Sequence, residues 1–469
     1  MRSPLLAKAI ALIVIIVILL SGLGMIGDVI SDRQRYSSEA SDSITNSYAG
    51  RQTIMGPLIH SACTETWNET EGSDKDKRLV EKRREFLLLA MPDQLAIQSG
   101  AGMEQRERGL HKVNTYNLKG QIKAQWNSLE ALLPQTTQKD SRINCGAPIL
   151  MLSVGDTRGI RTAQLQMGES QLSLKPGTFH PQYTRGLHAS LPDGLRGQTT
   201  PLAITLDFEL AGTERIAFVP LGSTTEVQMS SNWPHPSFAG RFLPSEREVR
   251  NDGFAARWRL SALATTAQQD VDNGASLCDG TDSSYANNRG CMDSFSVSFI
   301  DPINPYSLAD RAIKYGAMFV LLTFVAVGMF ELMKRLRVHP VQYLLVGAAL
   351  CTFFLLLVSL SEHFAFGIAY AVAASACVLL LTYYASFILG GMARGLPLGG
   401  GVALLYALLY LLLQLEQTAL VVGAIALFAV LAAIMVATRK VNWYALTPVL
   451  PGAPAPAVQA PTAPQGSQP

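Results

Sequence analysis

The stretch AIALIVIIVILLSGLGMI, from Ala9 to Ile26, decides the class of fold because none of its 18 residues is charged. An apolar run of this length is typical of a helix that crosses a bilayer. A cleaved signal peptide is the alternative, since the small residues Ser21 and Gly22 follow the most apolar part. The run nevertheless continues to Ile26, and no A-x-A cleavage pattern follows its most apolar part. We therefore expect an uncleaved N-terminal anchor at residues 1–27.

Five more apolar stretches lie in the C-terminal third of the chain, each near the ~20 residues that a spanning helix needs. They run from Ala312 to Met333, Val341 to Leu360, Phe364 to Leu389, Leu398 to Leu413 and Thr418 to Thr438. They predict a five-helix transmembrane domain at residues 311–440. The remaining residues, 441–469, are rich in Pro and Ala without an apolar period, which indicates a disordered cytoplasmic tail.

The charges between these stretches orient the chain in the membrane. Basic residues fall in every second connection: Lys334, Arg335 and Arg337, then Arg394, then Arg439 and Lys440. The alternate connections, residues 361–364 and 415–417, contain no Lys or Arg. Because cytoplasmic loops carry an excess of Lys and Arg, both termini are predicted to be cytoplasmic. Residues 28–310 are then expected on the opposite side of the membrane, in the periplasm.

The segment between the anchor and the C-terminal helices has a β pattern. Short alternating runs such as PLAITLDFELAG, from Pro201 to Gly212, are bounded by Gly, Pro, Asp or Asn. Residues 28–310 are therefore predicted to form one large, mostly-β, sandwich-like domain. Asp28 to Asn46 lacks turn residues and is expected to extend the first helix beyond the bilayer. The charged segment from Asn68 to Arg84 is expected to be a solvated loop or a hairpin tip.

Cysteine placement fits an oxidising compartment. Four cysteines, Cys63, Cys145, Cys278 and Cys291, lie in the β domain. Four thiols in such a domain suggest two disulfides. Cys278 and Cys291 enclose a polar loop and are the expected pair. Cys63 would then join Cys145 by elimination, although sequence alone does not fix that connectivity.

The segment SNWPHPSF, from Ser231 to Phe238, is a candidate functional loop. Each proline biases the residue before it, Trp233 or His235, toward an extended conformation and cannot donate to a sheet ladder. A stiff, non-ladder connection follows, and we interpret it first as a structural elbow. A docking surface is the second interpretation, made by Trp233, Pro234, His235, Pro236 and Phe238. Catalytic or metal chemistry at His235 is the weakest, because no metal-ligand or nucleophile motif accompanies it.

The turn SVGDTRGI, from Ser153 to Ile160, places a carboxylate and a guanidinium two residues apart. An ion pair between Asp156 and Arg158 that stabilises the turn is the simpler interpretation. Alternatively, Arg158 could bind an anionic ligand of the cell envelope through two parallel hydrogen bonds.

Ionisable residues in the membrane part lie near the ends of the apolar stretches. Glu331 and His339 flank the first basic connection, whereas Glu362, His363 and Glu416 lie at the two non-basic ones. Helix capping and hydrogen bonding are the simpler explanation. A proton relay or metal pocket formed by Glu362, His363 and Glu416 is the alternative.

Several long motifs, in this order, resemble the CreD family of bacterial inner-membrane proteins, also called cell-envelope integrity proteins. They are GPLI at 56–59, SVGDTRGI at 153–160, the SNWPHPSF segment, FLPSEREV at 242–249, DRAIKYG at 310–316, FELMKRLRVHPVQYLLVG at 330–347, LSEH at 360–363 and NWYAL at 442–446. The resemblance covers nearly the whole chain. It implies a Gram-negative inner-membrane protein under two-component control, linked to envelope stress and integrity, colicin tolerance and the β-lactam response. It implies no catalytic residues.

Taken together, these observations favour a non-enzymatic protein whose periplasmic β domain binds or scaffolds an envelope protein, lipid or glycan. No cofactor is expected. Nucleic acid is excluded as a partner because the formal net charge is only +2 and the middle of the chain holds no basic tract. The alternative is a membrane-embedded enzyme that acts on lipid or glycan at the periplasmic face, with Glu362, His363 and His235 as acid, base or ligand. A small-molecule exporter is a third hypothesis.

Overall fold

The computed structural model describes residues 4–71, 78–108, 111–278, 290–300, 305–334, 338–388, 391–415 and 418–439. It divides into two compact units. The helical unit combines Met1–Ser31 with Pro305–Pro469, and the β unit is Asp32–Asn304. Helix α1, Pro4–Ser47, contributes to both units. The predicted tail at 441–469 lies outside the described residues.

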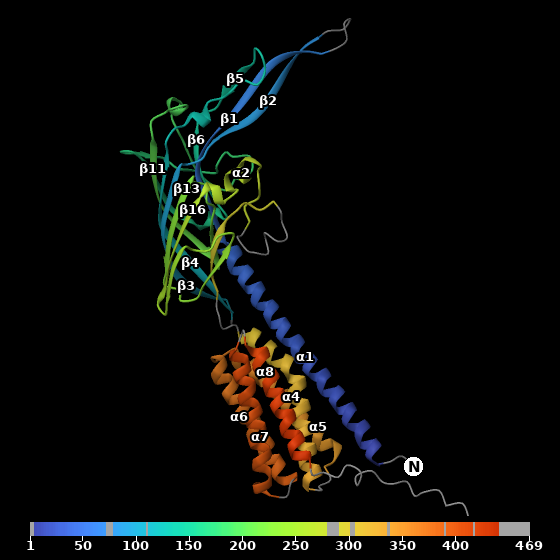
Figure 1. Cartoon of the computed structure of the whole chain (residues 1–469). Coiled ribbons are helices and arrows are strands. Elements are labelled where there is room, and N and C mark those ends of the chain that lie inside the picture. Colours follow the sequence, from blue (N-terminus) through green and yellow to red (C-terminus); the bar gives the residue numbers. More distant parts are fainter. Residues whose placement is uncertain are drawn as a thin grey trace, which may run out of the picture. The chain divides into compact units, whose positions relative to one another are not determined.

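The helical unit contains α4 to α8 besides the first part of α1 (Figure 1). The bounds are Pro305–Lys334 for α4, Pro340–Ser361 for α5, Phe366–Ile388 for α6, Met392–Gln414 for α7 and Ala419–Thr438 for α8. Among the described residues, five helices are long and apolar enough to cross a membrane: α1, α4, α5, α6 and α7. The apolar stretch of α8, Val421–Val436, is shorter. The arrangement confirms an N-terminal apolar helix and a C-terminal group of apolar helices.

Helix α1 is about twice as long as the hydrocarbon core of a bilayer is thick. Its 44 residues correspond to about 66 Å at the α-helical rise, whereas the hydrocarbon core measures about 30 Å. The helix therefore continues well past its apolar stretch, as expected for Asp28 to Asn46. Its apolar part packs against α5, where a β carbon at Gly347 would lie 2.1 Å from Leu19 Cδ1. Glycine at position 347 thus permits this close helix contact.

The β unit is a sandwich of two sheets. Within the described residues, sheet A has nine strands, ordered β14-β17-β12-β1-β6-β10-β9 with β2 and β5 paired to β1, and sheet B has eight, ordered β15-β16-β13-β3-β4-β11-β7-β8. The strands are β1 Gln52–Glu71, β2 Arg78–Ala90, β3 Gln94–Arg108, β4 His111–Trp126, β5 Arg142–Cys145, β6 Ile149–Val154, β7 Ile160–Met167, β8 Ser170–Leu172, β9 Lys175–Pro176, β10 Gly186–Ser190, β11 Leu202–Thr213, β12 Arg215–Phe218, β13 Thr224–Ser231, β14 Pro236–Gly240, β15 Glu246–Arg250, β16 Gly253–Ser261 and β17 Phe295–Phe299. The mostly-β, sandwich-like prediction is confirmed.

One apolar core lies between the two sheets. Trp258 of sheet B stacks on Phe295 of sheet A with ring centroids 5.0 Å apart, and each is at most 1% exposed. Strand β11 shows how the sequence builds this core, because its alternate residues Leu202, Ile204 and Leu206 are buried. The alternation leaves the intervening side chains of sheet B on its outer face.

Strands β1 and β2 form a hairpin that extends beyond the rest of sheet A (Figure 1). The two strands pair from Ile59 opposite Ala90 to Glu71 opposite Arg78. Residues 68–71 and 78–84 thus form the end of this hairpin, and residues 72–77 lie outside the described part.

Both expected disulfides are present. Cys63 of β1 is bonded to Cys145 of β5, directly opposite in the strand register. Cys278 is bonded to Cys291, which closes the loop between them. Cys351 and Cys377, in α5 and α6, are free.

Candidate functional site

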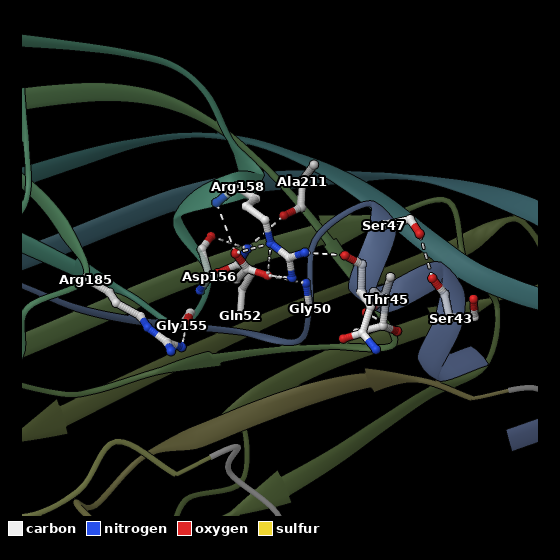
Figure 2. A network of polar contacts seen from close by, with 12 residues as sticks. Ser43, Thr45, Ser47, Gly50, Gln52, Gly155, Asp156, Arg158, Arg185 and Ala211 are labelled. Carbon is white, nitrogen blue, oxygen red and sulfur yellow. Dashed lines mark hydrogen bonds and ion pairs between the residues drawn. The ribbon is translucent and has the colours of Figure 1, made fainter. Parts of the chain in front are cut away.

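The Asp156–Arg158 turn joins the end of α1 to the β sandwich (Figure 2). The Arg158 guanidinium donates from Nε to Asp156 Oδ1 at 3.0 Å and from Nη2 to Asp156 Oδ2 at 2.6 Å. It also donates from Nη1 to the carbonyl oxygen of Asn46, in the last turn of α1. An arginine there satisfies a carbonyl that the helix itself leaves unpaired and interacts favourably with the helix dipole. The turn therefore holds the C-terminal end of α1.

The carboxylate of Asp156 is the centre of this junction. It accepts the backbone N–H of Gly50 at 2.9 Å and that of Arg158 at 3.0 Å, besides the guanidinium. Burial alone would raise the pKa of Asp156, but the hydrogen bonds from Arg158 and Gly50 outweigh it and lower the pKa to about 2. Asp156 is therefore ionised at neutral and moderately acidic pH.

Two residues next to the turn, Gln52 and Gly159, are required by the hydrogen bonds and close contacts of the backbone there. Gln52 accepts from Asp156 N at 3.0 Å and donates to the carbonyl oxygens of Asp156, at 3.0 Å, and Ala211, at 2.9 Å. A β carbon at Gly159 would lie 2.2 Å from Ala211 O, so glycine is required there. The ion-pair interpretation of this motif is thus what the geometry supports. The alternative interpretation is that Arg158 binds an anionic ligand. In the structure, the N–H donors of Arg158 bind Asp156 and Asn46 instead.

The SNWPHPSF segment connects the two sheets, since β13 belongs to sheet B and β14 to sheet A. The expectation of a non-ladder connection is wrong for its last part, because Pro236 begins β14 and lies opposite Phe299 of β17. Pro236 is tolerated there because β14 is the edge strand of sheet A and Pro236 its first residue.

Trp233 anchors this connection to the β unit. Its side chain packs against the core, and its indole N–H donates to Ile300 O at 2.9 Å. His235 is exposed beside it, with ring centroids 6.5 Å apart, and Phe238 packs edge-on against Trp258. Pro234 is half-buried between Trp233 and His235. The elbow interpretation fits these contacts, whereas a catalytic centre at His235 has no supporting neighbour among the described contacts.

Glu362 and His363 follow the last turn of α5. Glu362 is its C-cap, and His363 is exposed with Nδ1 3.3 Å from Ser359 O. Glu416 lies outside the described residues. At the other end of the helices, His339 caps α5 in a reciprocal capping box with Gln342. Among the described residues, no group of three or more His, Cys, Asp or Glu side chains could hold a metal ion.

A polar cleft crosses the outer face of sheet B and was not anticipated from sequence. Side chains opposite one another on seven adjacent strands form a continuous polar row: Glu246, Arg257, Gln228, Gln98, Gln121, Asp207 and Gln164. The neighbouring row contains the small residues Gly100, Ser230 and Ala255 between Lys119 and Glu248. These small residues leave a hollow of about 590 Å³ between longer side chains.

Charged side chains border the cleft, with Lys119 on one side and residues of both signs on the other. Lys119 is 72% exposed, and its only described acidic partner, Glu209, is 4.0 Å away. Arg257 pairs with Glu226 and Glu246, each at 3.4 Å. Gln98 is exposed on the floor between them. These amide and charged groups face solvent, so they can hydrogen-bond a polar ligand that has no apolar surface of its own.

Alternating polar positions in β3, β4, β13 and β16 are the sequence signal that could have indicated this cleft. Such alternation is also the ordinary pattern of a solvated sheet face. The hollow depends on which small residues lie side by side across strands, and strand order is not readable from one sequence.

Comparison with known proteins identifies relatives over nearly the full length. Residues 4–444 match the family described as "Inner membrane protein CreD". The Inner membrane protein CreD of Escherichia coli (strain K12) is 33% identical over 450 residues, which cover 95% of each chain.

Solved structures give only a distant likeness. An M1 zinc metallopeptidase mutant from Deinococcus radiodurans, bound to a Tyr-Ser-Ala substrate, has a TM-score of 0.20 and 12% identity, covering 36% of this chain and 38% of that one. The M1 zinc metallopeptidase of the same organism gives a TM-score of 0.18 and 11% identity over the same shares. TM-scores this low support no inference about fold or function.

Proposed function

Because the chain belongs to the CreD family of inner membrane proteins, we propose that its β domain lies in the periplasm and binds a polar polymer of the cell envelope, without catalysing a reaction. The observation that carries this proposal is the cleft on sheet B, bordered by Lys119, Glu248 and Arg257. Within the same unit, Arg158 holds the C-terminal end of α1 against the β sandwich through Asn46.

The periplasmic placement rests on two features of the chain. Basic residues mark alternate connections of the C-terminal helices, which favours a cytoplasmic position for both termini. Two disulfides in the β domain suit an oxidising compartment. A reporter that is active only outside the cytoplasm, inserted in the exposed loop at Thr200, should be active. Activity of a cytoplasm-only reporter there would refute this placement.

The chemistry of the cleft favours a glycan-type ligand such as a peptidoglycan strand. Its amides, Gln98 and Gln228, match the N-acetyl and hydroxyl groups of such a strand. Lys119 matches the carboxylates, since it faces solvent with its acidic neighbour 4.0 Å away. An open, elongated cleft suits a linear polymer better than a small metabolite, which is usually enclosed.

Co-sedimentation of the purified full chain, in detergent micelles, with isolated peptidoglycan sacculi tests the proposal. Lys119→Glu reverses the exposed charge, and Gly100→Trp fills the hollow, where a β carbon would meet Ser230 Oγ at an ordinary 3.7 Å. We expect each variant to raise the dissociation constant about tenfold, which corresponds to ~1.4 kcal/mol.

Lys112→Glu is the matched control. Lys112 is on the same strand, 59% exposed and paired with Glu107 at 3.2 Å, but does not line the cleft. Its binding should equal that of the unaltered chain. The cleft is refuted as a glycan site if the unaltered chain and all three variants sediment equally. It is also refuted if the unaltered chain does not sediment with sacculi above background.

A further inference from the structure

Three of the seven histidines of the chain are buried together at one end of sheet A. His60 of β1 is 1% exposed, His188 of β10 is 4% exposed, and His180, between β9 and β10, is 6% exposed. The rings of His60 and His180 meet edge to face with centroids 5.7 Å apart. Residues 177–186, here termed the histidine loop, cover this cluster.

The hydrogen bonds of His60 define its protonation state. Its Nε2 lies 2.9 Å from Thr178 O, and because a carbonyl only accepts, Nε2 carries the hydrogen. Its Nδ1 is buried and has no hydrogen-bond partner among the described residues. A second proton on Nδ1 would therefore create a buried cation with an unsatisfied N–H, which is costly.

His180 is held neutral by a different geometry. Its Nδ1 accepts the backbone N–H groups of Gln182 at 3.2 Å and Tyr183 at 3.3 Å. Protonation of Nδ1 would place three N–H groups against one another. Protonated His180 therefore cannot keep the closed conformation of the histidine loop.

The histidine loop also holds the segment that leads to the Cys278–Cys291 disulfide. Tyr183 donates its hydroxyl to Ala275 O at 2.8 Å, and Gln182 donates to Gly274 O. Phe179 adopts φ +56°, which is unfavourable for a residue with a side chain, and is 70% exposed. The loop thus contains a strained residue directly beside the buried histidines.

We propose that the histidine loop is an acid-sensitive switch: protonation of His60 and His180 opens it and frees the segment from Gly274 to Cys278. The periplasm follows the external pH more closely than the cytoplasm does, so a periplasmic domain can use such a switch to respond to acid. This inference does not depend on the ligand of the cleft.

The other titratable groups around the cluster do not offset this effect. Asp270 and Asp272 of α2 (Ala267–Asp272) act on Tyr183, and Lys175 lies opposite His188 in the strand register. The residues opposite His60 on β2 and β6, Leu89 and Ile149, are uncharged. Arg185 directs its guanidinium to Gly155 O, 3.3 Å away.

Burial lowers the pKa of His60, outweighing the hydrogen bond to Thr178, and His188 lowers it further. Burial, and then His60, lower the pKa of His180 to about 4. In the open loop both groups return to about 6.5. The closed loop is therefore fully stable above about pH 6.5 and loses stability as the pH falls toward 4. His180 shifts the open-to-closed ratio about tenfold per pH unit between pH 6.5 and 4, and His60 adds to this shift in the same direction.

Hydrogen–deuterium exchange of the full chain in nanodiscs, corrected for intrinsic rates, measures the switch without any substitution. Protection of residues 177–186 should fall by at least about tenfold between pH 6.5 and 5, while β11 stays protected. Protection of the loop that does not change between pH 7.5 and 4.5 would refute the proposal.

Two substitutions remove the protonation sites and keep the hydrogen bonds. Asn in place of His180 retains an acceptor at the Nδ1 position, and Gln in place of His60 retains a donor at the Nε2 position. The double variant His60→Gln with His180→Asn should keep the loop protected at pH 5. The exposed His235→Asn is the control and should open like the unaltered chain. Equal opening of the double variant would show that the histidines are not the sensor.

Discussion

The guanidinium of Arg158 binds the carbonyl oxygen of Asn46 and the carboxylate of Asp156 at the same time. One side chain thus joins the last turn of α1 to a turn that precedes β7 of sheet B. The two partners require donors in a fixed, planar arrangement, which arginine offers and lysine does not.

Arg158→Lys should therefore weaken the β unit although the charge is kept. Because Arg158 is 51% exposed, we expect a small loss in the free energy of unfolding. Urea unfolding of the full chain in micelles, followed by tryptophan fluorescence, measures it. The control is Arg250→Lys, since Arg250 also pairs with a carboxylate two residues earlier, Glu248, but does not contact α1. Equal effects of the two substitutions would contradict a role at the α1 junction.

The low pKa of Asp156 predicts how the junction responds to acid. Its pKa is lowered from 3.8 to about 2, so its contribution is present above about pH 4 and is lost as the pH falls through 2. Asp156→Asn should remove this part of the acid dependence and lower stability at pH 7. The histidine loop opens at higher pH, so the two transitions are separable in an acid titration. An Asp156→Asn variant with the unaltered acid profile would disprove the assignment.

Much of the architecture could be predicted because it depends on local pattern. The apolar run from Ala9 to Ile26 and the absence of turn residues up to Asn46 both indicate α1, which the structure shows as one helix. Period-two alternation indicated a sandwich. The pairing of Cys278 with Cys291 followed from the polar loop between them, whereas Cys63 and Cys145 meet because β5 pairs with β1, 82 residues away.

The functional features escaped prediction because they depend on strand order. His60 is far from His180 and His188 in sequence and meets them only through the pairing of β1, β6 and β10. The cleft likewise requires Gly100 beside Ser230, which are joined by parallel pairing of β3 with β13. The Asp156–Arg158 pair was readable from its spacing, but its contact with α1 was not.

The two disulfides should contribute unequally to stability. The Cys63–Cys145 bond closes 82 residues and the Cys278–Cys291 bond 13. In the chain-entropy description the longer loop corresponds to about 4–5 kcal/mol and the shorter to about 3 kcal/mol. Thermal unfolding of the Cys63→Ser/Cys145→Ser and Cys278→Ser/Cys291→Ser variants compares them. A larger loss for the second pair would show that the disulfide near the histidine loop acts on native packing rather than on the unfolded chain.

Within the helical unit, Lys8 of α1 pairs with Glu331 of α4, and Tyr343 of α5 donates to the same carboxylate at 2.9 Å. The two side chains are only 27% and 16% exposed, so removing either leaves a poorly solvated charge behind. We expect Glu331→Gln and Lys8→Met each to cost about 2–3 kcal/mol, and the double variant clearly less than their sum. Thermal unfolding in nanodiscs provides the double-mutant cycle.

The control for this cycle is the exposed ion pair of Lys314 with Asp310, one helical turn away on α4. Lys314 Nζ lies 2.7 Å from Asp310 Oδ2. Lys314 is 70% exposed, so Lys314→Met should change stability by less than about 0.5 kcal/mol. Additive losses at Lys8 and Glu331 would mean that the carboxylate is held by Tyr343 and the backbone N–H of Val338 instead. Coupling well above the ~0.5 kcal/mol expected of an exposed pair would establish that α1 is fixed to the helical unit by this charge pair as well as by its packing at Gly347.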